Sequence, residues 1–198
     1  LEIKGIGLTG VGILTTKKPD GQPGFSLLII ISSEFQPIQL GLGFKLNGVG
    51  GILGLNRTVA IDVLREGIKN RTLDSILFPR NPIENAPKII SDLKRVFPDA
   101  EGRFIFGPMA KISWGTPTVI VADIGLALEV PDPVRLVILG KIRAALPKEE
   151  DRPLIQLNMD VLGTVDFEKS MVSIDARLYD SRLLLYTLSG VMALRLGW

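Results

Sequence analysis

Apolar and polar residues alternate over the stretch from Leu154 to Phe167. The apolar parity holds Ile155, Leu157, Met159, Val161, Val165 and Phe167. The other parity holds Gln156, Asn158, Asp160, Thr164 and Asp166. A period of two over this length predicts a long β-strand with one apolar and one solvated face.

Similar strands follow one another through the second half of the chain, and we expect them at 103–114, 118–130, 134–146, 153–167, 170–179 and 184–196. The connections between them are short, as in Gly115-Thr116-Pro117 and Glu168-Lys169. Short connections between long strands favour antiparallel neighbours. Strands longer than the usual five or six residues must twist and curl, so we expect a half-barrel or trough.

The first 56 residues are rich in glycine and predict three more strands, at 1–16, 25–35 and 37–46. Six glycines lie between Gly41 and Gly54. A dinucleotide fingerprint counted from Gly48 would need glycine where Leu53 stands, and a P-loop would need Gly-Lys-Ser/Thr at its end. Because both phosphate-binding patterns fail, we interpret this segment as a glycine-kinked strand and turn.

Residues 57–98 change to a helical pattern. Thr58 predicts an N-cap for a first helix, and a second helix is predicted to begin near Asn85 and to end at Pro98. The apolar stripe of the second helix holds Ile89, Ile90, Leu93, Val96 and Phe97. Amphipathic helices need an apolar partner, and we expect them to pack on the sheet.

These elements predict an α+β fold dominated by a long curved antiparallel meander, with a two- or three-helix insert near 58–97. We expect residues 1–198 to form one domain, with N-terminal strands at 1–56, the helical insert at 57–98 and the meander at 103–198. The chain opens on Leu1 without a recognisable signal peptide, which we interpret as a fragment of a larger chain.

One parity of the later strands is continuously aliphatic, and we expect the helices to cover about half of that face. A remaining uncovered patch would be a binding surface. The candidate apolar groove consists of Ile120, Ile124, Leu126, Leu128, Leu136, Ile138 and Ile142. The alternative is a closed core, in which the N-terminal strands or flanking sequence cover this face.

The chain has neither Cys nor His, which removes thiol nucleophiles, the commonest soft metal ligands and the usual proton shuttle near neutral pH. Asp160, Asp166 and Asp175 are the remaining candidates for a carboxylate- or metal-dependent hydrolase. Acidic residues also decorate solvated sheet faces, where Lys169, Arg177 and Arg182 would pair with them. We assign no catalytic, cofactor-binding or metal-binding residue and expect no enzymatic activity.

The net charge of +2 comes from mixed signs along the chain, so no nucleic-acid partner is indicated. No apolar run approaches the roughly 18 residues of a membrane helix. The sequence does not indicate a compartment.

Several motifs together resemble a family of domains of unknown function that lies within long β-rich bacterial proteins. The motifs are Phe44 to Arg57, Leu77-Phe78-Pro79, Asn85-Ala86-Pro87, Phe106 to Ala110, Trp114 to Pro117 and Leu178 to Arg182. The resemblance implies a bacterial origin and a larger parent chain, and it carries over no activity. We expect a non-enzymatic module that presents an apolar trough to lipid-like ligands or to neighbouring modules of its parent chain.

Overall fold

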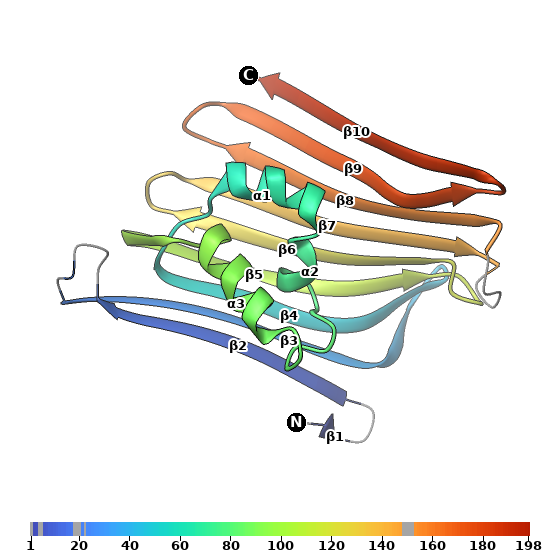
Figure 1. The fold of residues 1–198 in the computed structure, drawn as a ribbon, viewed down its shortest axis with the longest axis horizontal. Coiled ribbons are helices and arrows are strands. Elements are labelled where there is room, and N and C mark those ends of the chain that lie inside the picture. The colour runs from blue at the N-terminus through green and yellow to red at the C-terminus, as the bar shows by residue number, and fades with distance from the viewer. Residues whose placement is uncertain (1, 4–5, 18–20, 22, 148–152) are drawn as a thin grey trace.

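The computed structural model describes residues 2–3, 6–17, 21, 23–147 and 153–198. Ten strands form one antiparallel sheet in which every strand pairs with its neighbours in sequence, from β1 at one edge to β10 at the other (Figure 1). The strands are β1 (Glu2–Ile3), β2 (Ile6–Lys17), β3 (Pro23–Gly41), β4 (Phe44–Arg57), β5 (Asp99–Trp114), β6 (Ile120–Val130), β7 (Arg135–Leu146), β8 (Ile155–Asp166), β9 (Met171–Leu183) and β10 (Tyr186–Gly197). The predicted fold class, a β-dominated antiparallel meander with a small helical insert, is confirmed.

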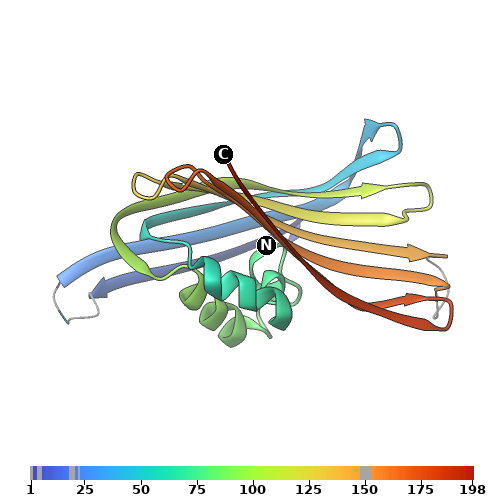
Figure 2. The same ribbon diagram turned by 90° about the horizontal axis from the view of Figure 1, so that it is seen from above.

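The helical insert joins β4 to β5 and lies on one face of the sheet only (Figures 1 and 2). Its elements are α1 (Ile61–Gly67), the short 3-10 helix η1 (Ile68–Asn70), α2 (Leu73–Ile76) and α3 (Ala86–Val96). The strands twist strongly, so that in Figure 2 the N-terminal strands cross the C-terminal ones at a wide angle. Long antiparallel strands twist in this way because of backbone sterics.

The prediction of separate strands at 25–35 and 37–46 was wrong, because β3 runs without interruption through Pro37. The pairing of β3 with β4 shifts its register between Glu34 and Ile38, around this proline. A proline has no N–H to donate to the sheet, and an irregularity of this kind accommodates it. The residues from 44 onward therefore belong to β4, the next strand.

The glycine-rich stretch is a strand, β4, as the failed phosphate-binding patterns indicated. Gly50 allows close backbone approach, because a Cβ there would lie 2.5 Å from the carbonyl oxygen of Ile31 on β3. Gly107 on β5 has the same role, with 2.0 Å from such a Cβ to the carbonyl oxygen of Leu126. Any side chain at these positions would push neighbouring strands apart.

Thr58 does not cap a helix, contrary to the sequence-based prediction. The residue that precedes α1 is Ala60, without a side-chain capping bond, and the hydroxyl of Thr58 instead donates to Glu129 on β6. A buried carboxylate competes for this hydroxyl, which lies in the linker that leads from β4 into α1. The second helix begins at Ala86, close to the predicted start.

The core lies between the helices and the sheet. Almost fully buried residues of the helices pack with almost fully buried residues of the sheet. The helices contribute Leu64 of α1 and Leu93 and Val96 of α3, and the sheet contributes residues such as Ile105 and Leu139. Ile90, which the helical pattern placed in the apolar stripe, is 39% exposed and lies at the margin of this contact.

Candidate functional site

The helices cover the face of the sheet that the sequence pattern marks as polar. On β6, the residues turned toward the helices are Asp123, Gly125, Ala127 and Glu129, and all four are buried. The aliphatic residues Ile124 and Leu126, between them in sequence, point to the other side of the sheet. The expectation that the helices cover part of the aliphatic face was therefore wrong.

Directly opposed residues in an antiparallel sheet lie on the same face, so the register of pairing traces the uncovered face from strand to strand. Phe106 on β5 is opposite Leu53 on β4 and Leu128 on β6, and Leu128 is opposite Leu136 on β7. We call this side the open face, because the helices lie on the other side of the sheet (Figure 2).

The register assigns these residues to the open face, in strand order from β2 to β10: Ile6, Leu8, Gly10, Gly12, Leu14; Leu27, Ile29, Ile31, Ser33, Phe35, Ile38; Phe44, Leu46, Val49, Gly51, Leu53, Leu55; Phe104, Phe106, Pro108, Ala110, Ile112, Trp114; Ile120, Ala122, Ile124, Leu126, Leu128, Val130; Leu136, Ile138, Gly140, Ile142, Ala144, Leu146; Ile155, Leu157, Met159, Val161, Gly163, Val165; Val172, Ile174, Ala176, Leu178, Leu183; Tyr186, Gly190, Met192, Leu194, Leu196.

No residue of the open face so defined is charged. Its hydrogen-bonding side chains are Ser33, Trp114 and, at the start of β10, Tyr186. The indole N–H of Trp114 is already donated to the carbonyl oxygen of Leu42 at 3.1 Å. Exposed apolar side chains occur across the whole width, with Ile31 46% exposed on β3, Phe106 47% on β5 and Met192 54% on β10. A monomer rarely exposes such a continuous apolar area without a use for it.

All seven predicted groove residues lie on the open face, on β6 and β7 near its centre. Ile124 is 36% exposed, and the other six are half-buried because side chains on adjacent strands shield one another. None of the seven lines any of four well-formed cavities in the part of the chain that the structure describes. The seven therefore lie within a broad surface, and they do not by themselves define a narrow groove.

The sequence pattern did not identify the parts of the open face on β2 to β5 and on β10. The signal that would have found them is the lack of charge on one parity. On β5, Phe104, Phe106 and Ile112 share one parity, and Lys111 and Ser113 share the other.

The predicted closure of the core by the N-terminal strands is also wrong. β2, β3 and β4 extend the same sheet and carry the open face with them. Strands that lie side by side in one sheet cannot cover each other's faces. In the described part of the chain, the second layer is the helical insert, on the opposite side (Figures 1 and 2).

The three candidate catalytic carboxylates lie on the helix-covered face. The expectation that they decorate a solvated face was wrong, because all three are buried. Asp160 is fully buried and accepts a 3.1 Å hydrogen bond from the Tyr179 hydroxyl, while its Oδ2 atom has no partner. Burial, partly offset by this hydrogen bond, raises the pKa of Asp160 to about 6. Burial, together with the adjacent Asp160 carboxylate, also raises the pKa of Tyr179.

Asp175 and Asp166 each have their own partners. Arg195 and Arg65 contact Asp175 at 2.6 and 3.0 Å; burial raises the pKa of this carboxyl, but hydrogen bonds from the two arginines outweigh burial and hold it below its usual value. Asp166 accepts from the backbone N–H of Lys169 and lies 3.6 Å from its amine. The predicted pairing with Lys169 is thus confirmed.

Arg177 and Arg182 contact backbone oxygens, those of Lys69 and Pro153. No group of three acidic side chains in the described residues is placed to hold a metal ion. The carboxylates on this face instead form ion pairs and hydrogen bonds within the fold.

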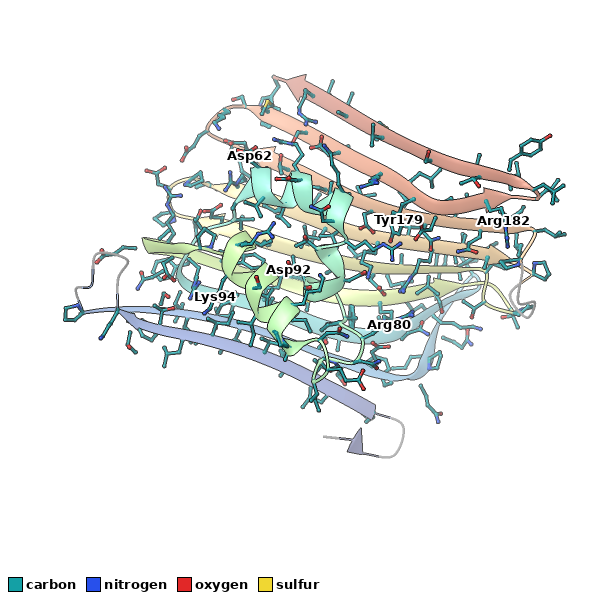
Figure 3. The ribbon with its side chains drawn as sticks, in the orientation of Figure 1. Asp62, Arg80, Asp92, Lys94, Tyr179 and Arg182 are labelled. Carbon is teal, nitrogen blue, oxygen red and sulfur yellow. The ribbon has the colours of Figure 1, made fainter. Side chains whose placement is uncertain are left out.

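A polar cavity of about 480 Å³ opens beside the helices and is lined by Arg71, Arg80, Lys141, Arg143 and Tyr179, among others. Two of these lining residues, Arg80 and Tyr179, are labelled in Figure 3. Three of the cations are already paired, Arg71 with Asp180, Lys141 with Asp74 and Arg143 with Asp123. The open face is therefore the stronger candidate for a functional surface.

The fold and this surface define a class of protein: a single-layer antiparallel β-meander with helices on one face and a bare aliphatic opposite face. The whole chain, residues 1–198, matches the family described as a family of unknown function, DUF6603, and the protein belongs to that family. No curated protein and no solved structure matches the chain. Among the described residues, no helix has the length and hydropathy to cross a membrane.

Proposed function

We propose that the domain is a non-enzymatic binding module that holds the acyl chains of a lipid-like ligand on its open face. The observation that carries this proposal is the chemistry of that face, which is predominantly apolar across nine strands and has no charged residue. Acyl chains require contact with apolar surface and no hydrogen bonds, so this composition suits them.

The lack of hydrogen-bonding groups favours acyl chains over a protein partner. Nine strands about 4.8 Å apart, each contributing about ten residues of 3.3 Å, give the face about 1,500 Å². A protein interface of that size carries on the order of ten direct hydrogen bonds. The open face offers the side chains of Ser33, Trp114 and Tyr186, and Trp114 is already bonded within the chain.

The absence of enzymatic activity is part of the same proposal. It is supported by the positions of the acidic residues, because Asp166 and Asp175 are held by cations of the fold and Asp160 is enclosed with Tyr179. The acidic, basic or nucleophilic groups of the open face are limited to the hydroxyls of Ser33 and Tyr186. Membership of this module in a longer bacterial protein stays a prediction.

The experiment is native mass spectrometry of the purified chain, followed by organic extraction and lipid analysis, and titration with a fluorescent C16 fatty acid. We expect acyl species bound at stoichiometric level or saturable fatty-acid binding. Ile124→Asp and Leu126→Asp are expected to lower binding at least tenfold while far-UV circular dichroism stays unchanged, because a charge in the middle of the face repels acyl chains.

The matched control is Ile83→Asp, because Ile83 is 90% exposed and lies in the connection between α2 and α3. This variant should bind like the wild type. A chain that carries no lipid and does not bind the fatty acid would overturn the proposal. Unfolding of the Ile124→Asp variant would instead show that the face is a closed core in solution.

A further inference from the structure

The polar cavity of about 480 Å³ beside the helices adjoins a second cavity of about 400 Å³. Arg80, Arg143, Gln156 and Asn158 line both cavities, so the two cavities meet at these four residues, which we call the shared wall. Arg80 lies in the connection between α2 and α3, and the other three lie on β7 and β8. At this end of the sheet the strands extend past the helices (Figures 1 and 2). A single ligand at the shared wall can therefore occupy both cavities.

The second cavity has a positively charged lining. Its charged residues, among those that the structure describes, are Arg80, Lys111 and Arg143. Lys111 pairs at 2.7 Å with Glu34, which does not line the cavity. A cavity lined by one sign of charge attracts ligands of the opposite sign.

The first cavity also has more cations than carboxylates in its described lining, with five cations against two carboxylates. The carboxylate partners of Lys88 and Arg143 are Asp92 and Asp123. Both of these partners are buried, and neither lines the cavity. The excess of positive charge thus continues from one cavity into the other.

Arg80 has no partner of its own within the described part of the chain. The residue is exposed, and its guanidinium forms neither an ion pair nor a hydrogen bond there. The connection that carries it is held in place, because the side-chain amide of Asn85 donates to the carbonyl oxygens of Arg80 and Asn81 at 3.1 and 3.2 Å. Phe78 and Asn81, on either side of Arg80, have φ angles of 47° and 46°. Residues other than glycine adopt this conformation at a cost in energy, and such residues concentrate at binding sites.

Arg143 supplies a second guanidinium in a fixed position. It is half-buried, and its Nη2 atom donates to Asp123 at 2.7 Å. A guanidinium has five N–H donors, and Arg143 makes no other hydrogen bond to a described residue. The remaining donors are available to an anion, in the forked geometry that suits phosphate.

Gln156 and Asn158 offer hydrogen-bond acceptors beside these cations. Both side-chain amides donate to the carbonyl oxygen of Asp180, at 3.3 and 2.9 Å. Their amide oxygens accept no hydrogen bond from the residues that the structure describes. An amide oxygen accepts readily from a hydroxyl group. The shared wall therefore combines two guanidinium groups for an anion with two acceptors for hydroxyl groups.

We propose that the shared wall binds a phosphate monoester of a polyhydroxy compound, of the sugar-phosphate type. Arg80 and Arg143 hold the phosphate group, which carries a charge of about −2 at neutral pH and has three acceptor oxygens. The amide oxygens of Gln156 and Asn158 accept hydrogen bonds from the hydroxyl groups. Because this site lies on the helix-covered side of the sheet, it is separate from the open face, and the proposal does not rest on lipid binding.

Isothermal titration calorimetry at pH 7 tests the proposal with glucose 6-phosphate as the probe. We expect saturable binding at millimolar or lower concentration and no measurable binding of glucose. Inorganic phosphate should bind at least about fivefold more weakly, because it lacks the contacts with the amide oxygens. Absence of glucose 6-phosphate binding, or equal binding of glucose, would overturn the proposal. Equal affinity for inorganic phosphate would overturn the assignment of the ligand class.

Arg80→Ala should weaken the binding of glucose 6-phosphate at least about tenfold, because it removes a charge-assisted contact. The far-UV circular dichroism should stay unchanged, since the guanidinium of Arg80 contacts no described group. Gln156→Ala should reduce the preference for glucose 6-phosphate over inorganic phosphate and leave the affinity for phosphate unchanged.

The matched control is Arg95→Ala, because Arg95 is exposed in the last turn of α3 and lines none of the four cavities. This variant should bind glucose 6-phosphate like the wild type. An equal loss of affinity in Arg95→Ala and Arg80→Ala would indicate general attraction by surface charge and would overturn the site. Unchanged affinity in Arg80→Ala would also overturn it.

The same phosphate ester can be free in solution or belong to a lipid headgroup. Flotation with phosphatidylcholine vesicles, with and without phosphatidylinositol 4-phosphate, distinguishes these sources. Stronger binding to the phosphoinositide vesicles that is lost in Arg80→Ala would assign a headgroup, and equal binding to both vesicles with glucose 6-phosphate still bound would assign a soluble ligand. Either outcome supports the site, whereas a phosphoinositide preference that persists in Arg80→Ala would overturn it. Ile124→Asp should lose fatty-acid binding and keep glucose 6-phosphate binding, so the two proposals fail separately.

Discussion

In this sheet, the usual distribution of charged and apolar residues between the helix-covered face and the uncovered face is reversed. The face under the helices buries Asp123, Glu129 and Asp160, each with at most 1% of its surface exposed. The open face, with no layer upon it, exposes Ile31, Phe106 and residues like them. A one-layer sheet normally turns its apolar side to its own helices and its polar side to water. Here the helices dock on the face that carries the charged residues, and the apolar face carries no further layer among the described residues.

The buried charges remain stable because each meets a specific group. Glu129 forms an ion pair with Arg135 on β7, accepts a hydrogen bond from the Thr58 hydroxyl and lies near the backbone N–H of Val59. Lys141 on β7 pairs with Asp74 of α2. Ion pairs of this kind fix where helices sit more than they raise total stability, because desolvation offsets much of the attraction. The apolar contribution to the core comes from aliphatic residues of the same face, such as Leu28, Ile105 and Leu139, together with those of the helices.

Neighbouring residues on β6 give the sharpest contrast between the faces. Ala127 is fully buried under the helices, whereas Ile124 is 36% exposed on the open face. Ala127→Asp would bury an unpaired carboxylate, and we expect a loss of more than 4 kcal/mol or outright unfolding. Ile124→Asp should cost about 1 kcal/mol, since its carboxylate reaches water. Urea denaturation followed by circular dichroism measures both, and similar losses would mean that the two faces are equally enclosed in solution.

Removing one member of the ion-pair set should have the next largest effect. Glu129→Ala leaves the Arg135 guanidinium buried without its carboxylate and frees the linker at Thr58 and Val59. Breaking a buried pair in this way costs about 3–5 kcal/mol. Glu66→Ala, at an exposed position on α1, is the control and should stay within about 0.5 kcal/mol of the wild type. Equal stability of the two variants in urea would show that Glu129 does not anchor the helices.

The sequence predicted the strands of the second half closely, since alternation and short connections are local signals. The expected strands at 118–130 and 134–146 correspond to β6 and β7. Which face the helices cover is not a local property. Alternation separates the faces, but the docking side depends on long-range contacts between helix and strand, such as the ion pair of Arg65 with Asp175. These partners are 110 residues apart, and no spacing rule connects them.

Asp160 provides a pH test of the covered face. Its pKa of about 6 in the folded state exceeds the value of about 3.9 for an exposed aspartate, so the folded state holds the proton more tightly between these values. The free energy of unfolding should therefore fall as the pH rises from about 4 to about 6. Asp160→Asn should remove this pH dependence and raise the free energy of unfolding by about 1–2 kcal/mol at pH 7, because the buried charge is lost.

Asp175 has the opposite sign and serves as the control. Its lowered pKa means that its contribution is present at neutral pH and is lost as the pH falls toward that value. Asp175→Asn should thus destabilise the protein at pH 7. Urea denaturation at several pH values between 3.5 and 8 distinguishes the two variants. A wild-type slope that survives in Asp160→Asn would assign the titration to another group.

We expect the smallest effect on stability for an ion pair on the helix-covered side that is exposed to water. Arg71, at the end of η1, pairs with Asp180 on β9, and their side chains are 52% and 62% exposed. The guanidinium also lies over the Tyr179 ring, 5.2 Å from its centroid. Solvent screens such a pair, so Arg71→Ala should cost less than about 1 kcal/mol at 0.15 M salt. Arg71→Lys, which keeps the charge, should lower the free energy of unfolding by even less. A loss in Arg71→Ala as large as that in Glu129→Ala would mean that exposed pairs hold the helices as firmly as buried ones, and the contrast drawn between the two kinds of contact would then fail.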